Sequence, residues 1–92
     1  MIQSFRDADT EHLFEARANR RWETIRKVAL RKLDQIQASI NLNDLRVPPG
    51  SHLEALVGGR KGQHSIRIND KYRICFIWKD DGAHEVEITD YH

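Results

Sequence analysis

One cysteine, two prolines and one methionine occur in this sequence of 92 residues, and it contains no long hydrophobic run. The single cysteine, Cys75, excludes a disulfide framework and favours a reducing compartment; because it lies among apolar residues of a predicted strand, we expect a buried thiol. No apolar stretch approaches the ~20 residues of a membrane-spanning helix. The N-terminus lacks the basic start and apolar core of a signal peptide. We therefore expect a soluble, cytoplasmic protein without a membrane partner.

Motifs for metal binding and nucleophilic catalysis are also missing. The histidines show no spacing typical of metal ligands, and no elbow motif surrounds any of the serines. Residues 58–62, Gly-Gly-Arg-Lys-Gly, lack the Gly-Lys-Ser/Thr ending and the following helix of a nucleotide P-loop. We therefore assign no metal and no cofactor.

Charged residues are abundant and nearly balanced. The 15 basic and 14 acidic side chains give a net charge of +1, but the basic ones are concentrated in patches, which permits RNA binding without proving it. The length predicts one domain, residues 1–92, that is too short for a deep substrate cleft. Specificity must then come largely from a partner.

The first half of the chain has the pattern of helices. Ile2 and Phe5 allow a short strand, after which Asp9 or Thr10 can cap a short helix. A longer helix follows, with one apolar stripe at three- and four-residue steps formed by Trp22, Ile25, Ala29, Leu33, Ile36 and Ile40. Residues 41–50, which include two consecutive prolines, predict an irregular connection to the β part. The expected fold class is α+β, with two N-terminal helices packed on one face of a small antiparallel sheet.

A β-hairpin is predicted over residues 65–76, and its apolar parity fixes the turn. If all its apolar residues face the helices, Ile68 pairs with Tyr72 across a three-residue loop, residues 69–71. Arg67 then lies opposite Arg73 on the other face, where we expect the Arg73 side chain to be exposed. Like charges opposed across a strand pair are unfavourable. Either a bound phosphate separates them, or both splay into water or pair with acids, Glu85 and Glu87.

The last predicted strand runs to the end of the chain. It follows a turn at residues 80–82 and covers residues 84–92, with Val86 and Ile88 toward the core and Glu87, Thr89 and Tyr91 on the face of Arg73. By strict alternation Asp90 and His92 share the core parity. His92 must therefore emerge past the sheet edge or curl to reach a substrate; the alternative is an ordinary frayed terminal residue.

The glycine-rich residues 58–62 offer backbone amides and basic side chains to a phosphate, although a plain flexible turn explains the glycines equally well. Outside the terminal residues, our candidates for RNA or phosphate binding are Arg60, Lys61, His64 and Arg67.

Residues 63–76 and the terminal Asp90-Tyr91-His92 resemble HigB toxins of the RelE superfamily, particularly the GraT type, and the resemblance extends over the whole chain. It implies a ribosome-dependent endoribonuclease that cuts mRNA and is inhibited by a HigA-type helix-turn-helix antitoxin, through which it contacts operator DNA indirectly. It also implies catalytic roles for Arg73, Asp90, Tyr91 and His92. In metal-free attack of the RNA 2′-hydroxyl on the adjacent phosphate, Arg73 stabilises the transition state, and His92, tuned by Asp90, transfers a proton. Tyr91 stacks on a base or shares in proton transfer.

One stretch departs from the better-known relatives, which carry a His and a Lys just before the glycine-rich loop. Here residues 53–57 read Leu-Glu-Ala-Leu-Val, so Glu54 is a candidate replacement base, and Arg60 or Lys61 a candidate replacement cation. The alternative is a weakened or non-catalytic homologue that binds the antitoxin and co-regulates its operon. A free-standing RNA-binding domain is the third hypothesis, and it is disfavoured because the hairpin aromatics have core parity.

Overall fold

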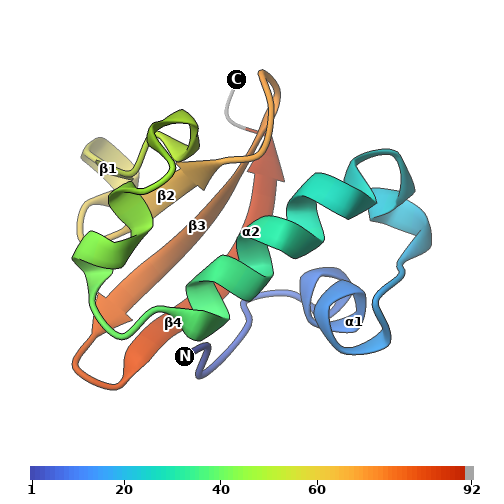
Figure 1. Cartoon of the computed structure of the whole chain (residues 1–92), viewed down its shortest axis with the longest axis horizontal. Helices are drawn as coiled ribbons and strands as arrows, with labels where there is room; N and C mark the ends of the chain where they lie inside the picture. Colours follow the sequence, from blue (N-terminus) through green and yellow to red (C-terminus); the bar gives the residue numbers. More distant parts are fainter. Residues whose placement is uncertain (91–92) are drawn as a thin grey trace.

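The computed structural model describes residues 1–90 and confirms the α+β class, with the helices preceding a four-stranded antiparallel sheet (Figure 1). The sheet order is β1-β2-β3-β4. The helices are α1 (Ala8–Ala16) and α2 (Arg26–Ala38), with short 3-10 helices η1 (Arg20–Ile25), η2 (Leu42–Arg46), η3 (Pro49–Ser51) and η4 (Gly58–Arg60). The strands are β1 (Glu54–Ala55), β2 (His64–Arg67), β3 (Tyr72–Lys79) and β4 (Gly82–Asp90).

Helix α1 begins earlier than the sequence predicted. Its N-cap is Asp7, in extended conformation, whose side chain accepts a hydrogen bond from the Thr10 N–H at 3.0 Å. Thr10 lies inside the helix and is fully buried, and its hydroxyl accepts from the backbone N–H of Ile88 at 3.2 Å. The predicted caps, Asp9 and Thr10, were therefore wrong, because Thr10 connects α1 to the edge of β4 instead.

The apolar stripe of the second helix is confirmed except at its end. The stripe begins in η1 with Trp22 and Ile25. It continues along α2, whose buried side chains include Ala29, Leu33 and Ile36. Helix α2 ends at Ala38, and Ser39 is extended. Ile40 is consequently 83% exposed rather than part of the core.

The predicted hairpin is confirmed. Ile66 pairs with Ile74 and Arg67 with Arg73, and the Ile68 N–H donates to the Tyr72 carbonyl at 3.0 Å across the expected loop. Asn69 organises that loop, because its side-chain oxygen accepts from two backbone N–H groups, at 2.8 and 2.9 Å.

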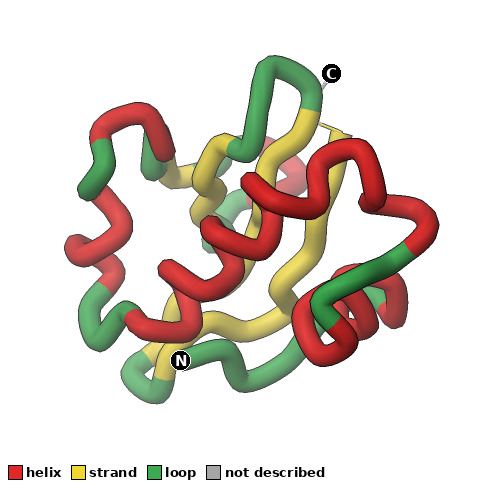
Figure 2. The backbone as a smooth tube through the Cα atoms, turned by 45° about the vertical axis from the view of Figure 1, so that its right-hand side comes forward, coloured by secondary structure: helices red, strands yellow, loops and turns green. Residues whose placement is uncertain are grey.

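The edges of the sheet differ from the prediction. The expected first strand is reduced to isolated parallel bridges, Ile2 to Ala83 and Phe5 to Val86, so the N-terminal segment runs beside the first half of β4. At the opposite edge the two-residue strand β1 pairs with β2, which the sequence did not predict. Figure 2 shows the segment that follows α2 in the sequence as it loops toward that edge and leads into the strands.

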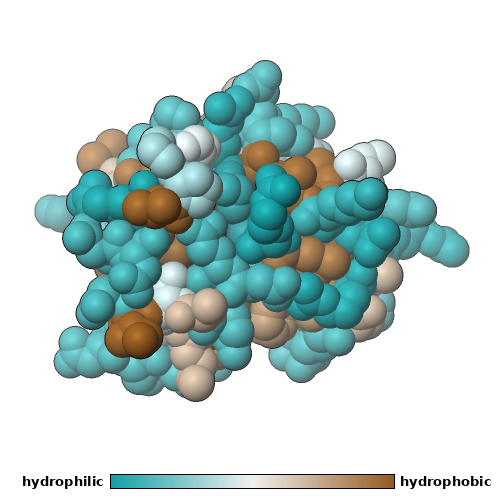
Figure 3. All heavy atoms as spheres, in the orientation of Figure 1, coloured by the Kyte–Doolittle hydropathy of each residue, from teal (hydrophilic) through white to brown (hydrophobic). Residues whose placement is uncertain are grey.

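The core lies between α2, α1 and one face of the sheet, as α2 crosses in front of the strands in Figure 1. In the same view the surface is mostly hydrophilic, with scattered hydrophobic patches (Figure 3). Over residues 1–90 no helix is long and apolar enough to cross a membrane.

Candidate active site

The face of the sheet turned away from the helices carries the arginines. Direct partners across antiparallel strands share a face, so the pairs Arg67–Arg73 and Arg73–Thr89 place all three side chains on it. By the same rule Cys75 and its partner Glu87 lie there too. The parity predicted for Arg67, Arg73, Glu87 and Thr89 is therefore confirmed.

Arg73 is more deeply buried than Arg67, its direct partner on this face. Its Nε donates to the Ser65 hydroxyl at 2.8 Å, and its Nη2 donates to the His52 carbonyl at 2.8 Å. The same nitrogen lies 3.4 Å from the Glu54 carboxylate. Only 12% of the Arg73 side chain is exposed, so the expectation of an exposed arginine was wrong. The cause is the loop before β1, which covers the guanidinium through the His52 carbonyl.

The charge conflict between the two arginines is relieved locally. Arg67 bonds the Asn69 carbonyl at 3.1 Å and forms a short ion pair with Asp70, whereas Arg73 pairs with Glu54. Each guanidinium thus pairs with a different carboxylate, one in the hairpin loop and the other on β1. Pairing of these arginines with Glu85 or Glu87 was the wrong alternative, and separation by a bound phosphate stays a prediction.

The glycine-rich loop divides its two basic side chains. Arg60, in η4, turns back to the sheet and reaches Glu87 at 2.8 Å and Gln63 at 3.1 Å. The Glu87 side chain is only 15% exposed and also lies 3.8 Å from Arg6. Lys61, the next residue, is exposed to solvent. The loop therefore fixes one cation beside the arginine face and leaves the other at the surface.

Two further side chains have pKa values changed by burial. Cys75 is fully buried, as predicted, and burial raises the pKa of its thiol, with Arg60, Glu87 and Arg73 close enough to modulate it. His64 is the β2 partner of Phe76, so it lies on the helix side, and their rings stack 6.4 Å apart. Burial, and secondarily the charge of Arg46, lowers the pKa of His64. Among the candidates for phosphate binding, His64 is thus separated from Arg67 by the sheet.

The C-terminal candidates are only partly covered by the structure. Asp90 ends β4 opposite Tyr72, with its carboxylate half exposed and 4.0 Å from the Lys71 ammonium. Tyr91 and His92 lie outside the described residues, so their catalytic roles stay predictions.

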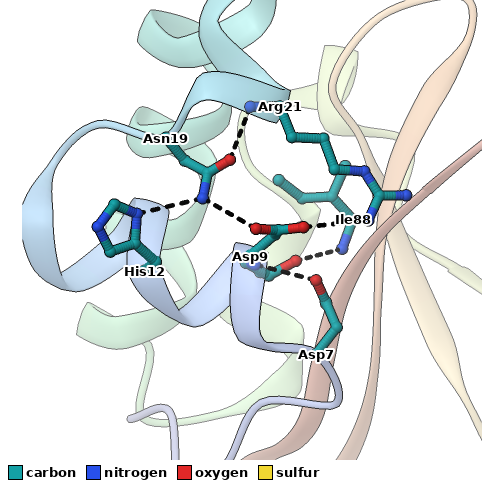
Figure 4. Close-up of polar contacts among 7 residues, drawn as sticks. Asp7, Asp9, His12, Asn19, Arg21 and Ile88 are labelled. Carbon is teal, nitrogen blue, oxygen red and sulfur yellow. Dashed lines mark hydrogen bonds and ion pairs between the residues drawn. The ribbon is translucent and has the colours of Figure 1, made fainter.

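A second polar cluster joins α1 to η1 (Figure 4). Asn19 connects the two elements, because its oxygen accepts from the Arg21 N–H at 2.9 Å while its nitrogen donates to Asp9 at 3.2 Å. The Arg21 guanidinium lies 3.4 Å from Asp9. Beside this cluster a hollow of about 470 Å³ extends to the C-terminal half of β4. Glu87 and Thr89, which belong to the arginine face, also line it, whereas Arg73 and Glu54 do not. The hollow therefore reaches around β4 to the margin of that face.

Sequence reasoning missed two residues that hold Arg73. Ser65 shares the face of Arg67 by simple alternation and is therefore recoverable from the hairpin register. His52 contributes only a backbone carbonyl from a loop, which no sequence pattern signals. Across residues 1–90 no three His, Cys, Asp or Glu side chains gather as a metal site.

A protein family and one curated relative match this sequence over nearly its whole length. Residues 3–92 match the family described as the RelE-like toxin of type II toxin-antitoxin system HigB. Toxin HigB-1 of Vibrio cholerae is 38% identical over 85 residues, which cover 90% of each chain. An uncharacterised protein of Haemophilus influenzae is 53% identical over 53 residues, which cover 58% of this chain and 50% of that protein.

This α+β domain, whose sheet carries arginines on one face, is therefore a RelE-like toxin. That class of protein implies ribonuclease activity in general. Within that class the chain belongs to the HigB family of type II toxin–antitoxin systems. The family implies an antitoxin partner.

Proposed function

We propose that this protein is a ribosome-dependent mRNA endoribonuclease that a HigA-type antitoxin inhibits. Cleavage proceeds by attack of an RNA 2′-hydroxyl on the adjacent phosphorus without a metal ion. The small size of the domain fits this proposal, because a chain of 92 residues is expected to be too short for a deep substrate cleft and would rely on the ribosome to present the mRNA in a bent, splayed conformation.

The observation that carries the proposal is the fixed position of Arg73. The Nε and Nη2 atoms of Arg73 are already held by hydrogen bonds of 2.8 Å, so the guanidinium needs little reorganisation energy when a phosphate binds. It stabilises the two negative charges that develop on the phosphoryl oxygens. Arg67, its direct partner on β2, adds a second positive charge to the same face.

Glu54 is the base in this proposal. Its carboxylate is half exposed and lies beside Arg73, so it can accept the proton of the 2′-hydroxyl while Arg73 holds the phosphate. The bond from the 2′-oxygen to phosphorus forms as the bond from phosphorus to the 5′-oxygen breaks. His92, oriented by Asp90, gives its proton to the departing 5′-oxygen, and Tyr91 stacks on a neighbouring base. The product is a 2′,3′-cyclic phosphate.

The test is single-turnover cleavage of ribosome-bound mRNA with excess protein, with and without EDTA, and with folding checked by circular dichroism. Arg73→Lys keeps a charge but loses the fork that reaches both anchors, so we expect the rate to fall about 100-fold or more. Arg31→Lys is the matched control, because Arg31 is exposed on α2. Parental cleavage by Arg73→Lys would refute the role of Arg73.

Two variants test the proton-transfer groups in the same assay. Glu54→Gln keeps the size of the side chain but removes the base, and we expect a loss of about 100-fold. Deletion of His92 should remove the acid and abolish cleavage. If the deletion cleaves at the parental rate, His92 has no part in the mechanism.

The second candidate function is a weakened or non-catalytic toxin that binds the antitoxin and co-regulates its operon. The ion pair at 3.4 Å between Glu54 and Arg73 favours it, because the carboxylate partly neutralises the cation that must bind phosphate. Mapping of cellular mRNA 5′ ends after induced expression separates the two. New codon-linked ends and slowed growth, relieved by the neighbouring helix-turn-helix protein, support the nuclease. A stable complex with that protein without new ends supports the alternative, and absence of a complex contradicts the HigA-type partner in both.

A further inference from the structure

A buried lysine on the helix side of the sheet contacts the loop that holds Arg73. Lys32 lies on α2, is only 7% exposed, and donates from its ammonium to the Ser51 hydroxyl at 2.6 Å. Ser51 ends η3 and is fully buried. The next residue, His52, supplies the carbonyl that Arg73 bonds at 2.8 Å. Two hydrogen bonds on adjacent residues thus join α2 to the guanidinium on the far face.

The burial of the Lys32 ammonium is only partly compensated. Burial lowers the pKa of Lys32, with the charge of Arg31 as a second cause, so the environment disfavours the ammonium. No ion pair to Lys32 forms within residues 1–90, and the hydroxyl of Ser51 compensates only part of the lost hydration. An apolar side chain of similar volume at this position removes the buried charge but leaves the buried Ser51 hydroxyl without its donor. These effects oppose each other, so we expect little net change in stability.

The backbone at His52 needs an external restraint. His52 has φ 47° and ψ 58°, the left-handed region that residues other than glycine adopt at a cost. Such conformations persist only where the surrounding structure fixes them. The bond from Lys32 fixes Ser51, immediately before the strained residue, and the His52 N–H bonds Pro49 at 3.1 Å.

We propose that Lys32 and Ser51 are positioning residues, which hold the His52 carbonyl in place and through it orient Arg73. Two other anchors of Arg73 within residues 1–90, Ser65 and Glu54, belong to strands of the same sheet. The His52 anchor lies instead in the loop after η3, which Lys32 joins to α2 through Ser51. The consequence for cleavage rests on the proposed function, whereas the orientation of Arg73 does not.

The decisive experiment measures the Arg73 side chain directly. Carbon-detected NMR gives the rate of rotation about the Arg73 Nε–Cζ bond, which the Nη2 bond to His52 slows; the signal is assigned by its loss in Arg73→Lys. We expect about tenfold faster rotation in Lys32→Met and in Ser51→Ala, equivalent to ~1.4 kcal/mol at the anchor. Lys27→Met, the same change at an exposed position of α2, should leave the rate unchanged.

The double variant Lys32→Met/Ser51→Ala tests whether the two act through one contact. If the Arg73 side chain rotates no faster in the double variant than in the single variants, the proposal is supported, because the effects of substitutions within one chain of contacts are not additive. An unchanged rate in Lys32→Met, or additive effects in the double variant, overturns it. Lys32→Met should melt near the parental temperature; if it does not fold, Ser51→Ala decides by the same rotation rate.

Cleavage provides the functional measurement. If the parent cleaves ribosome-bound mRNA, Lys32→Met should lower kcat about 10- to 100-fold with KM little changed, despite its nearly parental melting temperature. Parental kcat in a variant with faster Arg73 rotation overturns the positioning role. If the parent itself does not cleave, the proposed nuclease function fails, while the rotation rates still decide how Arg73 is held.

Discussion

The start of β4 is where a single added methyl group should be most disruptive. Gly82 has φ +128°, and a Cβ built there would lie 2.0 Å from the Met1 carbonyl oxygen. That oxygen accepts the Ala83 N–H at 2.8 Å, and the Gln3 N–H bonds the Ala83 carbonyl at 2.7 Å. Gly82→Ala therefore forces an L side chain into an unfavourable backbone region and pushes the N-terminal segment off the edge of β4.

The expected cost follows from these two effects. The backbone strain is worth about 1–3 kcal/mol. Loss of the two backbone hydrogen bonds adds about 1 kcal/mol each. Gly82→Ala should thus lower the free energy of unfolding by about 3–5 kcal/mol, and the melting temperature by at least ~10 °C.

Urea and thermal unfolding followed by circular dichroism measure this change. Gly59→Ala is the matched control, since Gly59 has no positive φ and no atom within 4 Å of an added Cβ. It should change stability by only about 0.5 kcal/mol. A loss below ~1 kcal/mol in Gly82→Ala would show that the N-terminal segment does not hold the edge of β4.

Three further predictions concern single side chains. The pKa of His64 is lowered in the folded protein, so the unfolded chain gains a proton first as pH falls. His64 therefore supports stability above the ordinary pKa of 6.5, and this contribution is lost as pH falls below that value. His64→Gln should flatten this pH dependence in urea titrations, and an unchanged dependence would contradict the effect of burial. The Cys75 thiol, buried and with a raised pKa, should react with thiol reagents only as fast as the chain unfolds, and rapid labelling of the native protein would contradict its burial. Asp7→Ala should cost about 1 kcal/mol through loss of the cap on the Thr10 N–H, against a smaller change for exposed Glu11→Ala; equal effects would refute the cap.

The hairpin could be predicted from the sequence because local rules alone fix its register. Apolar parity requires Ile68 to face Tyr72, and alternation then assigns Arg67 and Arg73 to the opposite face whatever else the chain does. The prediction that Ile40 belongs to the buried stripe was wrong, because apolar residues at three- and four-residue steps do not show where a helix ends. Asp7 was missed as a cap because Asp9 and Thr10 are equally good cap residues, and only the contact of Thr10 with β4 decides among them.

The sequence by itself determined the fold class, the family and the identity of the main phosphate-binding candidate, since periodicity, strand alternation and motif residues act over short distances. Tertiary structure alone decided how Arg73 is held. Three of its anchors within residues 1–90 lie 8, 19 and 21 residues away in the chain, at Ser65, Glu54 and His52. Such partners depend on how the loop from η3 to β1 packs between α2 and the sheet edge, which is a property of the packed core and not of any local pattern.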